Sequence, residues 1–480
     1  MSPAFWSASR LARALRARRL GALELFDLYA ARVARYNPPL NAICVMDLES
    51  GRKQARAADR ARGPRGPLHG LPMTVKESFD LAGFPSTHGI VEFRDNVARR
   101  DALAVARLEA AGAIVFGKTN VPTQLADWQT FNEIYGTTNN PWDRSRTPGG
   151  SSGGSAAALA AGLTALELGS DIGASIRAPA HYCGVYGHKP TWGICATNGH
   201  ALPGSAQPAD ISAIGPLARS AGDLRLALGV IAGPDEIDAA GWRLALERTV
   251  LRKVRGLRIA VMTSHPTAEV DASVAGQIER LAAWLAKKGA RVSDRARPDF
   301  EPEEAHRVYL ALLRGATSSR QNARQMALWE ELARKRPPED MSYEAQAARA
   351  NLMPHREWLR FSNRRHQMRR AWAAFFRDWD VLLCPTAATA AFPQNQKGER
   401  WERMISVNGK PQPSTTQMFW AGYSGAALLP STVAPIASSA EGLPIGVQIV
   451  GPQYGDYRCI AFAELLEREY RAFEPPPGYD

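Results

Sequence analysis

Residues 147–158 read TPGGSSGGSAAA, and residues 169–179 read GSDIGASIRAP. Glycine, alanine and hydroxyl-bearing residues make up most of both stretches, so few of their side chains can fill a core. A glycine-rich backbone can turn tightly and bring its N–H groups close to a ligand. Serine hydroxyls placed among such donors indicate a nucleophile beside a site that binds an oxyanion.

The whole chain has the composition of a globular protein. It has 480 residues, of which 45% are hydrophobic and 22% charged, and this length is enough for one large α/β domain or two ordinary ones. Its apolar runs are far shorter than the ~20 residues of a membrane helix. The N-terminal residues MSPAFW do not have the pattern of a secretory signal. We therefore expect no membrane contact.

Charge and cysteine content narrow the expected partners and location. The net charge is +12, but the arginines are spread over segments expected to be helical, where they form solvated faces. No zinc-finger spacing and no basic motif with interleaved aromatic residues is present, so we expect no nucleic-acid partner. Five scattered cysteines without a CxxC pair are typical of a reduced, cytoplasmic protein.

Hydrophobic periodicity predicts alternating helices and strands. The expected helices are residues 22–36, 51–62, 101–111, 155–163 and 271–289, and the expected strands are residues 41–46, 68–76, 113–118, 257–262, 381–385 and 446–450. Residues 302–378 are expected to be almost entirely helical, and the polar residues 392–414 to form a surface loop. This order predicts one α/β sandwich with a helical insertion late in the chain.

Three other kinds of site are disfavoured by their sequence context. The glycines are not followed by the Gly-Lys-Ser/Thr of a phosphate-binding loop. Residues 150–154 match the G-x-S-x-G elbow, which would make Ser152 the nucleophile, but the polar, proline-containing residues before them cannot form the required strand. His181, Cys183 and His188 lack the further ligands of a metal site, so ordinary packing is favoured for them.

Lys76, Ser151 and Ser175 then stand out as a group. They lie within motifs that closely match a known family, and the chain is identified as resembling the amidase signature family. The spacing between the three residues also agrees with that family. The matching segments are residues 70–77, 117–120, 149–158, 171–179, 187–190 and 442–448.

The resemblance implies a fold and a catalytic triad. The fold would be a single α/β/α sandwich over residues 1–480, with a mixed central β-sheet flanked by helices. Residues 68–192 would form the catalytic core, and residues 302–378 would contribute to the substrate entrance. Ser175 would be the acyl-forming nucleophile, Ser151 would relay protons from within a cis peptide, and Lys76 would be the base. No metal or organic cofactor is implied.

The proposed role of Lys76 sets a physical requirement. A serine hydroxyl becomes a good nucleophile only when a base takes its proton. Lysine can be that base only when uncharged, so its pKa of ~10.4 must fall by about 3 units. Burial lowers the pKa of a lysine, and the apolar run at residues 71–75 is consistent with burial of Lys76.

Further residues would surround this triad. By the resemblance, Asp171 and Arg177 form an ion pair that holds the nucleophile turn, and Ser152 and Ser155 donate hydrogen bonds around it. The expected oxyanion-hole N–H groups are those of Ile172, Gly173, Ala174 and Ser175. The expected substrate contacts are Leu125, Ala126, Trp128, Gly149, Gly150, Phe419 and Trp420.

Some of these expectations remain open at the level of sequence. Trp128 is equally consistent with a place in the core. Phe419 and Trp420 suit a neutral, partly aromatic substrate. Ala174 stands where the family usually has glycine, and it has a steric cost if that position needs a positive φ. His188 stands where the family usually has leucine, and the sequence offers no reason for it.

The expected activity is hydrolysis of a carboxamide C–N bond through an acyl-enzyme, by a monomer or a homodimer. Its substrate would be a small amide, such as an aryl amide or anilide, or an ester or carbamate, the last making the protein a urethanase. One alternative is the glutaminase A subunit of a tRNA-dependent amidotransferase, which works with partner subunits. The other is a non-catalytic binding protein on the same fold.

Overall fold

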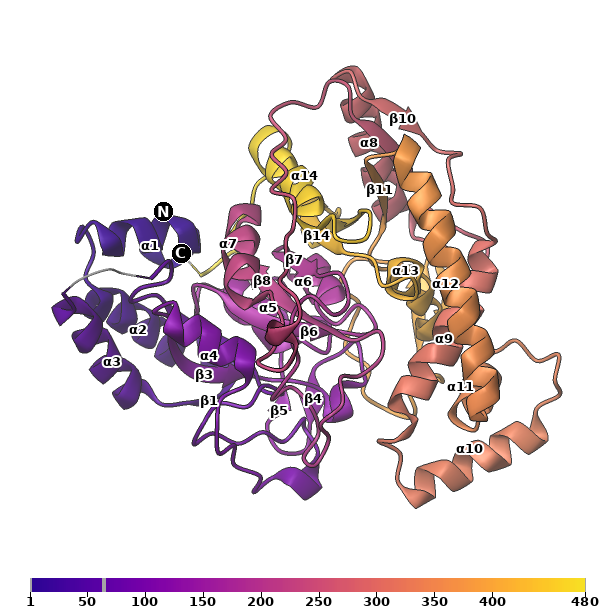
Figure 1. The fold of residues 1–480 in the computed structure, drawn as a ribbon, viewed down its shortest axis with the longest axis horizontal. Coiled ribbons are helices and arrows are strands. Elements are labelled where there is room, and N and C mark those ends of the chain that lie inside the picture. Colours follow the sequence, from indigo (N-terminus) through magenta and orange to yellow (C-terminus); the bar gives the residue numbers. More distant parts are fainter. Residues whose placement is uncertain (1, 63–65, 480) are drawn as a thin grey trace.

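The computed structural model describes residues 2–62 and 66–479. Within them, eleven strands form one large sheet in the order β1-β3-β2-β6-β8-β7-β14-β15-β11-β9-β10 (Figure 1). These strands are β1 (Ile43–Met46), β2 (Pro72–Lys76), β3 (Ile114–Thr119), β6 (Glu167–Asp171), β7 (Tyr186–Lys189), β8 (Ala213–Ala218), β9 (Arg258–Val261), β10 (Arg291–Ser293), β11 (Val381–Pro385), β14 (Ser431–Ser438) and β15 (Pro444–Val450).

The sheet is mixed. Strand β2 runs parallel to both of its neighbours, β3 and β6, whereas β6 and β8 are antiparallel. Strands β7, β14, β15 and β11 continue the sheet in antiparallel pairs, and β9 is parallel to β11 and β10. Strands β2 and β6 are buried along their whole length, as expected for central strands covered on both faces.

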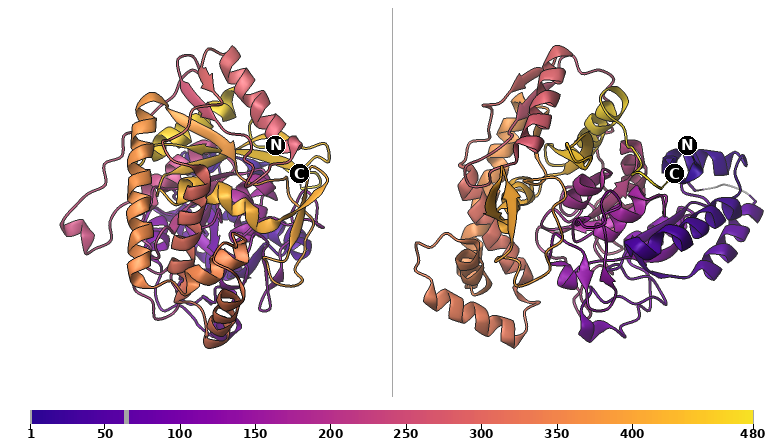
Figure 2. Two further views of the ribbon diagram at one scale, coloured as in Figure 1. Left: turned by 90° about the vertical axis from the view of Figure 1, so that its right-hand side faces the viewer. Right: turned by 180° about the vertical axis from the view of Figure 1, so that it is seen from behind.

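Helices surround this sheet (Figure 2). They are α1 (Ala8–Arg16), α2 (Ala22–Leu40), α3 (Leu48–Arg60), α4 (Leu103–Ala110), α5 (Gly153–Ala160), α6 (Arg177–Cys183), α7 (Ala221–Ile231), α8 (Ala272–Lys287), α9 (Pro302–Ser318), α10 (Ala323–Lys335), α11 (Tyr343–Asn351), α12 (His355–Asp378), α13 (Met418–Gly425) and α14 (Asp456–Glu469). The chain is therefore an α/β/α sandwich with a mixed central sheet, as expected.

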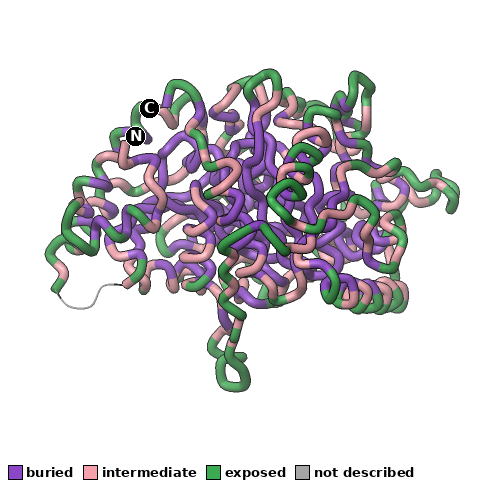
Figure 3. Tube along the Cα trace, turned by 90° about the horizontal axis from the view of Figure 1, so that it is seen from above, coloured by how far each residue is buried: buried purple, intermediate pink, exposed green. Residues whose placement is uncertain are grey.

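Small residues let one helix lie deep in this fold. Every residue of α5 is buried, although the helix consists only of glycine, serine, alanine and one leucine. Because these side chains are short, the helix can approach the strands beside it closely. The buried core is continuous through the centre of the molecule (Figure 3).

Residues 302–378 are mostly helical, as expected, and form four helices, α9 to α12. Figure 1 shows them together at one side of the molecule, with α10 lying outermost. Tyr309, Leu310 and Leu313 of α9 belong to a buried cluster that also contains Ala174 and Ala178. The insertion therefore packs directly against the loop that carries Ser175.

Two expectations about local structure are wrong. Residues 392–414 contain a hairpin rather than only a loop, formed by β12 (Met404–Val407) and β13 (Lys410–Pro413). Asn408 and Gly409 both have positive φ at its turn, and Ile405 and Val407 face inward. Asn-Gly between alternating apolar residues is a hairpin signal, and it was present in the sequence.

Helix α2 also continues past its expected end, through Pro38 and Pro39 to Leu40. Proline has a helical φ, so a helix can run through it in the last turn, where it lacks only one backbone donor. A second two-stranded sheet, β4 (Phe131–Asn132) with β5 (Gly136–Thr137), lies outside the large sheet. Among the described helices, none combines the length and the apolar character needed to span a bilayer.

Candidate active site

Lys76 is the last residue of β2, and its side chain is completely buried. Its Nζ lies 2.6 Å from Ser151 Oγ and 2.9 Å from Ser170 Oγ. Strand β2 lies between β3 and β6. Ser170 comes from β6, and Ser151 from the loop before α5. The central strands therefore bring an amine and two hydroxyls together at one end of the sheet.

The surroundings of Lys76 make its uncharged form accessible near neutral pH. Burial lowers the pKa of its amine to about 7, because a low-dielectric environment disfavours the charged form. The carboxylate of Asp171 opposes this change, whereas the guanidinium of Arg320 reinforces it. At pH 7 a large fraction of the Lys76 amine is therefore uncharged and able to accept a proton.

Ser151 occupies a turn that the glycine-rich loop makes possible. The peptide bond between Gly150 and Ser151 is cis, as the resemblance implied. A Cβ on Gly150 would lie only 2.3 Å from the carbonyl oxygen of Asp127, so no larger residue fits there. The next residue, Ser152, donates its N–H to the carbonyl oxygen of Ser175 at 3.0 Å, which ties the two serine loops together.

Ser175 lies between β6 and α6 and is buried except for a small part of its surface. Ser151, Ser170 and Ser175 line the same cavity, of about 300 Å³. No hydrogen bond joins the hydroxyls of Ser151 and Ser175 within the described residues. Hydrogen bonds of this kind are often long without substrate and tighten in the substrate complex.

The loop before Ser175 has a conformation that exposes several N–H groups. Ala174 has a φ of 68°, the left-handed region that favours glycine, so the expected steric cost applies to this alanine. Its N–H donates to Asp171 Oδ1 at 2.9 Å and is therefore not free for a substrate oxygen. Within the described residues, the N–H groups of Ile172, Gly173 and Ser175 have no acceptor.

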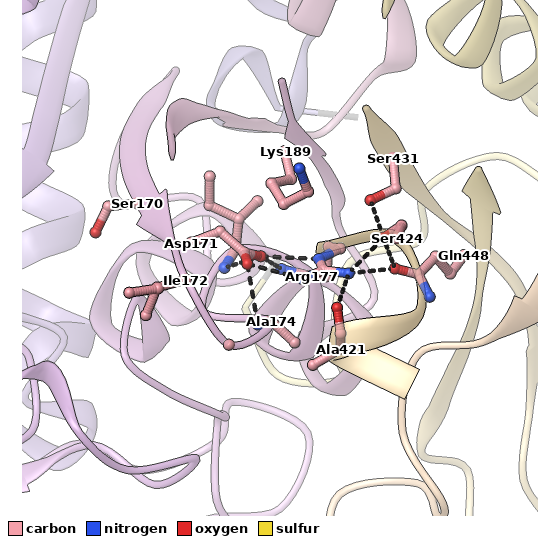
Figure 4. A network of polar contacts seen from close by, with 12 residues as sticks. Ser170, Asp171, Ile172, Ala174, Arg177, Lys189, Ala421, Ser424, Ser431 and Gln448 are labelled. Atoms are coloured by element: carbon pink, nitrogen blue, oxygen red, sulfur yellow. Dashed lines mark hydrogen bonds and ion pairs between the residues drawn. The ribbon is translucent and has the colours of Figure 1, made fainter. Parts of the chain in front are cut away.

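A buried ion pair fixes this turn, as the resemblance implied. Arg177 Nη2 lies 2.8 Å from Asp171 Oδ1, and both side chains are inaccessible to solvent (Figure 4). Burial alone would raise the pKa of Asp171, but the guanidinium of Arg177 holds it below its usual range. Arg177 Nη1 also donates to the carbonyl of Ala421, to Ser424 Oγ and to Gln448 Oε1, at 3.1, 3.0 and 2.5 Å.

Two aromatic side chains hold the carbonyl groups of the same turn. The hydroxyl of Tyr309, from α9, donates to the Ile172 carbonyl at 3.1 Å. The indole N–H of Trp128 donates to the Gly173 carbonyl at 2.7 Å. Because a carbonyl and the following N–H belong to one rigid peptide plane, these two bonds fix the directions in which the N–H groups of Gly173 and Ala174 point.

We expect Tyr309→Phe to lower kcat about tenfold while KM changes little, because a small misorientation near the reacting atoms slows the chemical step more than binding. The measurement is steady-state kinetics on a p-nitroanilide. Tyr423→Phe is the matched control, since the buried Tyr423 hydroxyl has no hydrogen-bond partner among the described residues. An unchanged kcat in Tyr309→Phe would contradict this positioning role.

The structure separates the expected substrate contacts into two groups. Leu125, Ala126 and Trp128 line the cavity, and Trp128 is only half-buried, so it is not a core residue. Gly149 and Gly150 are absent from the cavity wall. Phe419 and Trp420 are also absent from it, and the expectation that they contact substrate is wrong.

The reason lies in α13. Phe419 and Trp420 are fully buried. Phe419 stacks on Tyr423 and on His265, inside the core. Their neighbour Met418 faces the cavity instead, because successive residues of a helix point in different directions.

The other expected residues have structural partners. Ser152 Oγ lies 3.4 Å from the Ser170 carbonyl, and Ser155 Oγ lies 2.8 Å from Thr119 Oγ1. His181 contacts the carbonyls of Gly446 and Thr389. His188 contacts Asp456 and Thr432, at 3.1 and 2.8 Å, which explains why a polar residue is accommodated at that position.

Sequence reasoning missed Ser170, Tyr309 and a group of arginines on the cavity wall. Ser170 directly precedes Asp171 at the end of a strand, so its position was a usable signal. Tyr309 and the arginines come from segments far away in the sequence, and only the fold brings them to the site.

The family model described as Amidase matches residues 24–460. The chain belongs to the amidase family. It is 34% identical over 472 residues to the indoleacetamide hydrolase of Bradyrhizobium diazoefficiens, which covers 96% of this chain and 86% of that protein. It is 31% identical to the A subunit of the glutamyl-tRNA(Gln) amidotransferase of Methylobacillus flagellatus, over 96% of each chain.

A solved structure of a bacterial aryl acylamidase of the amidase signature family has the same fold. It superimposes with a TM-score of 0.81 at 24% identity, covering 97% of each chain. The family match and the relative from Bradyrhizobium make the protein an amidohydrolase, which acts on amide C–N bonds.

Proposed function

We propose that this amidase hydrolyses small carboxamides through an acyl-enzyme formed on Ser175. The observation that carries the proposal is the buried Lys76 amine, which lies 2.6 Å from Ser151 Oγ. Ser151 and Ser175 line the same cavity. An uncharged amine, a relay hydroxyl and a nucleophile hydroxyl are the three groups that such a reaction needs.

The proposed reaction has two stages, acylation of Ser175 and hydrolysis of the acyl-enzyme. Ser175 Oγ attacks the carbonyl carbon while its proton passes to Ser151, and Ser151 passes its own proton to Lys76. The N–H groups of Ile172, Gly173 and Ser175 stabilise the negative oxygen that forms. The C–N bond then breaks, and the leaving nitrogen takes a proton from Ser151, which Lys76 replaces. Water cleaves the resulting ester by the same relay and releases a carboxylic acid.

Aryl amides and anilides are the proposed substrates, with esters and carbamates cleaved by the same chemistry. Two tryptophans besides Trp128 line the cavity, Trp329 and Trp401, which favours a flat or aromatic group in the substrate. The relative from Bradyrhizobium is named for hydrolysis of indoleacetamide, an amide with such a group. Arg314 and Leu328, from α9 and α10, also line the cavity, which supports a role of the helical insertion at the entrance.

The test is a panel of p-nitroanilides, simple amides, aryl esters and aryl carbamates, combined with a fluorophosphonate that labels activated serines. We expect turnover of at least one amide and labelling of Ser175. Absence of both would overturn the proposed function and favour a binding protein. Turnover of glutamine that appears only with added amidotransferase partners would instead favour the role of a glutaminase A subunit.

We propose that the enzyme acts as a monomer or a homodimer in the cytoplasm. Its five cysteines are all free, which suits a reducing compartment. Size-exclusion chromatography with light scattering measures the oligomeric state.

The pH dependence of the reaction follows from the uncharged form of Lys76. The pKa of this amine is about 7, so kcat/KM for an uncharged amide is expected to rise with pH and level off above it. Below pH 7 it falls tenfold per pH unit, as one protonation predicts. The nearby imidazole of His88 does not interfere, because burial lowers its pKa to about 3. A profile flat between pH 5 and 8 would contradict the role of Lys76.

A further inference from the structure

The wall of the catalytic cavity carries more positive than negative charge. Four arginines line it: Arg314, Arg320, Arg400 and Arg403. Only Arg403 has a carboxylate partner, Asp127, at 2.6 Å. For the other three, the described residues supply no ion pair. Glu399 also lines the cavity, but it is exposed and its carboxylate pairs with none of them.

Arg320 differs from the other three arginines in its contacts. It follows α9, and its side chain makes no hydrogen bond or ion pair within the part of the chain that the structure describes. Burial lowers the pKa of its guanidinium, and no carboxylate counteracts this. Arg320 is half-buried in the cavity wall. Charged groups taken partly out of water are normally paired, so a guanidinium there without a partner among the described residues is available to pair with a charge on the ligand.

Arg320 also lines the same cavity as the proposed reacting serines, Ser151 and Ser175. Its charge lowers the pKa of Lys76, and it acts in the same direction on the buried imidazoles of His88 and His200. His200 lines the same cavity as Arg320 and Ser151. An anion bound to Arg320 would therefore lie in the same cavity as the carbonyl group that Ser175 attacks.

Arg314 and Arg400 add a second group of donors. Arg314 donates to the hydroxyl of Tyr343, and Arg400 Nη1 donates to the Ala126 carbonyl at 2.6 Å. The Nε atoms of both arginines are buried without a hydrogen-bond acceptor among the described residues. Their charge makes this side of the cavity favourable for an anion.

We propose that the amide substrate carries a carboxylate, a few bonds from the scissile C–N bond, and that this carboxylate pairs with the guanidinium of Arg320. Arginine binds carboxylates through two parallel N–H···O bonds, and Arg314 and Arg400 add favourable charge. The inference rests on the proposed function of Ser175. It replaces the expectation of a neutral substrate, which depended on Phe419 and Trp420, two residues that do not reach the cavity.

The test uses substrates that differ only in charge. Glutaryl p-nitroanilide has a carboxylate on the acyl side, and its methyl ester is the neutral counterpart. N-acetyl-3-aminobenzoate has the carboxylate on the amine side, again with its methyl ester. We expect the wild type to favour the charged member of at least one pair by about 30-fold or more in kcat/KM, the loss expected when one partner of a buried charge pair is removed.

Variants at Arg320 then test whether this residue causes the preference for the charged substrate. In Arg320→Gln the two members of the preferred pair should react at similar rates, mainly through a higher KM for the charged one. Arg320→Lys should keep part of the preference, because it keeps the charge but not the planar fork. Arg324→Gln is the matched control, since Arg324 is an exposed arginine on the same segment, and it should behave as wild type.

A preference on the acyl side or on the amine side supports the inference and identifies the part of the substrate that carries the charge. Equal rates within both pairs would overturn it, while hydrolysis of the neutral amides would leave the proposed function standing. Binding of glutarate and of 3-aminobenzoate, measured by calorimetry, gives a readout that does not depend on turnover. If neither anion binds the wild type, or if both bind Arg320→Gln equally well, the inference fails even when no amide is cleaved.

Discussion

Replacing Ser175 by alanine is expected to lower kcat by at least about 10⁴-fold, the order found when the nucleophile of a serine hydrolase is removed. The variant should fold normally, because Ser175 holds the neighbouring loop through its carbonyl, which accepts from the Ser152 N–H, and not through its hydroxyl. Burst kinetics with a p-nitroanilide and fluorophosphonate labelling, read out by intact-mass spectrometry, measure the effect.

Ser152→Ala is the matched control for this experiment. Ser152 also lies in the glycine-rich loop and would be the nucleophile if the G-x-S-x-G interpretation were correct. Its hydroxyl lies 3.4 Å from the Ser170 carbonyl, so its loss should reduce the rate by no more than about tenfold, the effect of one weak neutral hydrogen bond. Activity retained in Ser175→Ala and lost in Ser152→Ala would reverse the assignment.

Replacing Lys76 is expected to give the second largest loss. A general base contributes about 10²–10⁴-fold, and the loss should be most evident at neutral pH. Lys76→Met is preferable to Lys76→Ala for this measurement, because methionine fills more of the buried volume and leaves a smaller cavity. The acid limb of the pH profile should disappear together with the activity.

Ser170→Ala provides the comparison for Lys76. It removes the second hydroxyl near Nζ, at 2.9 Å, but leaves the amine and its contact with Ser151 in place. We expect this variant to keep an acid limb, displaced at most slightly. If the pH profile of the Lys76 variants matches that of the wild type, the proton relay as described is wrong.

The part of the site that the sequence predicts well is local. Lys76 at a strand end, the cis bond before Ser151 and the ion pair between Asp171 and Arg177 all belong to short, continuous motifs. The cis bond and the ion pair were implied by the resemblance to the family, which such motifs carry because the backbone geometry and the residues that require it lie within a few positions of each other.

The remainder depends on contacts between distant segments. Whether Phe419 or Met418 faces the cavity is decided by how α13 packs on α9, which periodicity does not reveal. Arg320 and Arg400 are 80 residues apart in sequence, and only the folded chain places both on one wall. The hydrogen bond from the Ala174 N–H to Asp171 is likewise visible only in the folded structure. The sequence shows that four N–H groups are present, but not which of them already have an acceptor.

The hydrogen bonds of Arg177 determine how long a fragment of this protein must be to remain active. Its guanidinium reaches the carbonyl of Ala421 and the side chain of Gln448, 244 and 271 positions further along the chain. A fragment ending after residue 192 would hold every proposed reacting group, yet lack the acceptors that keep the nucleophile turn in place. Nascent chains should therefore stay inactive until β15 has been synthesised and has joined the sheet.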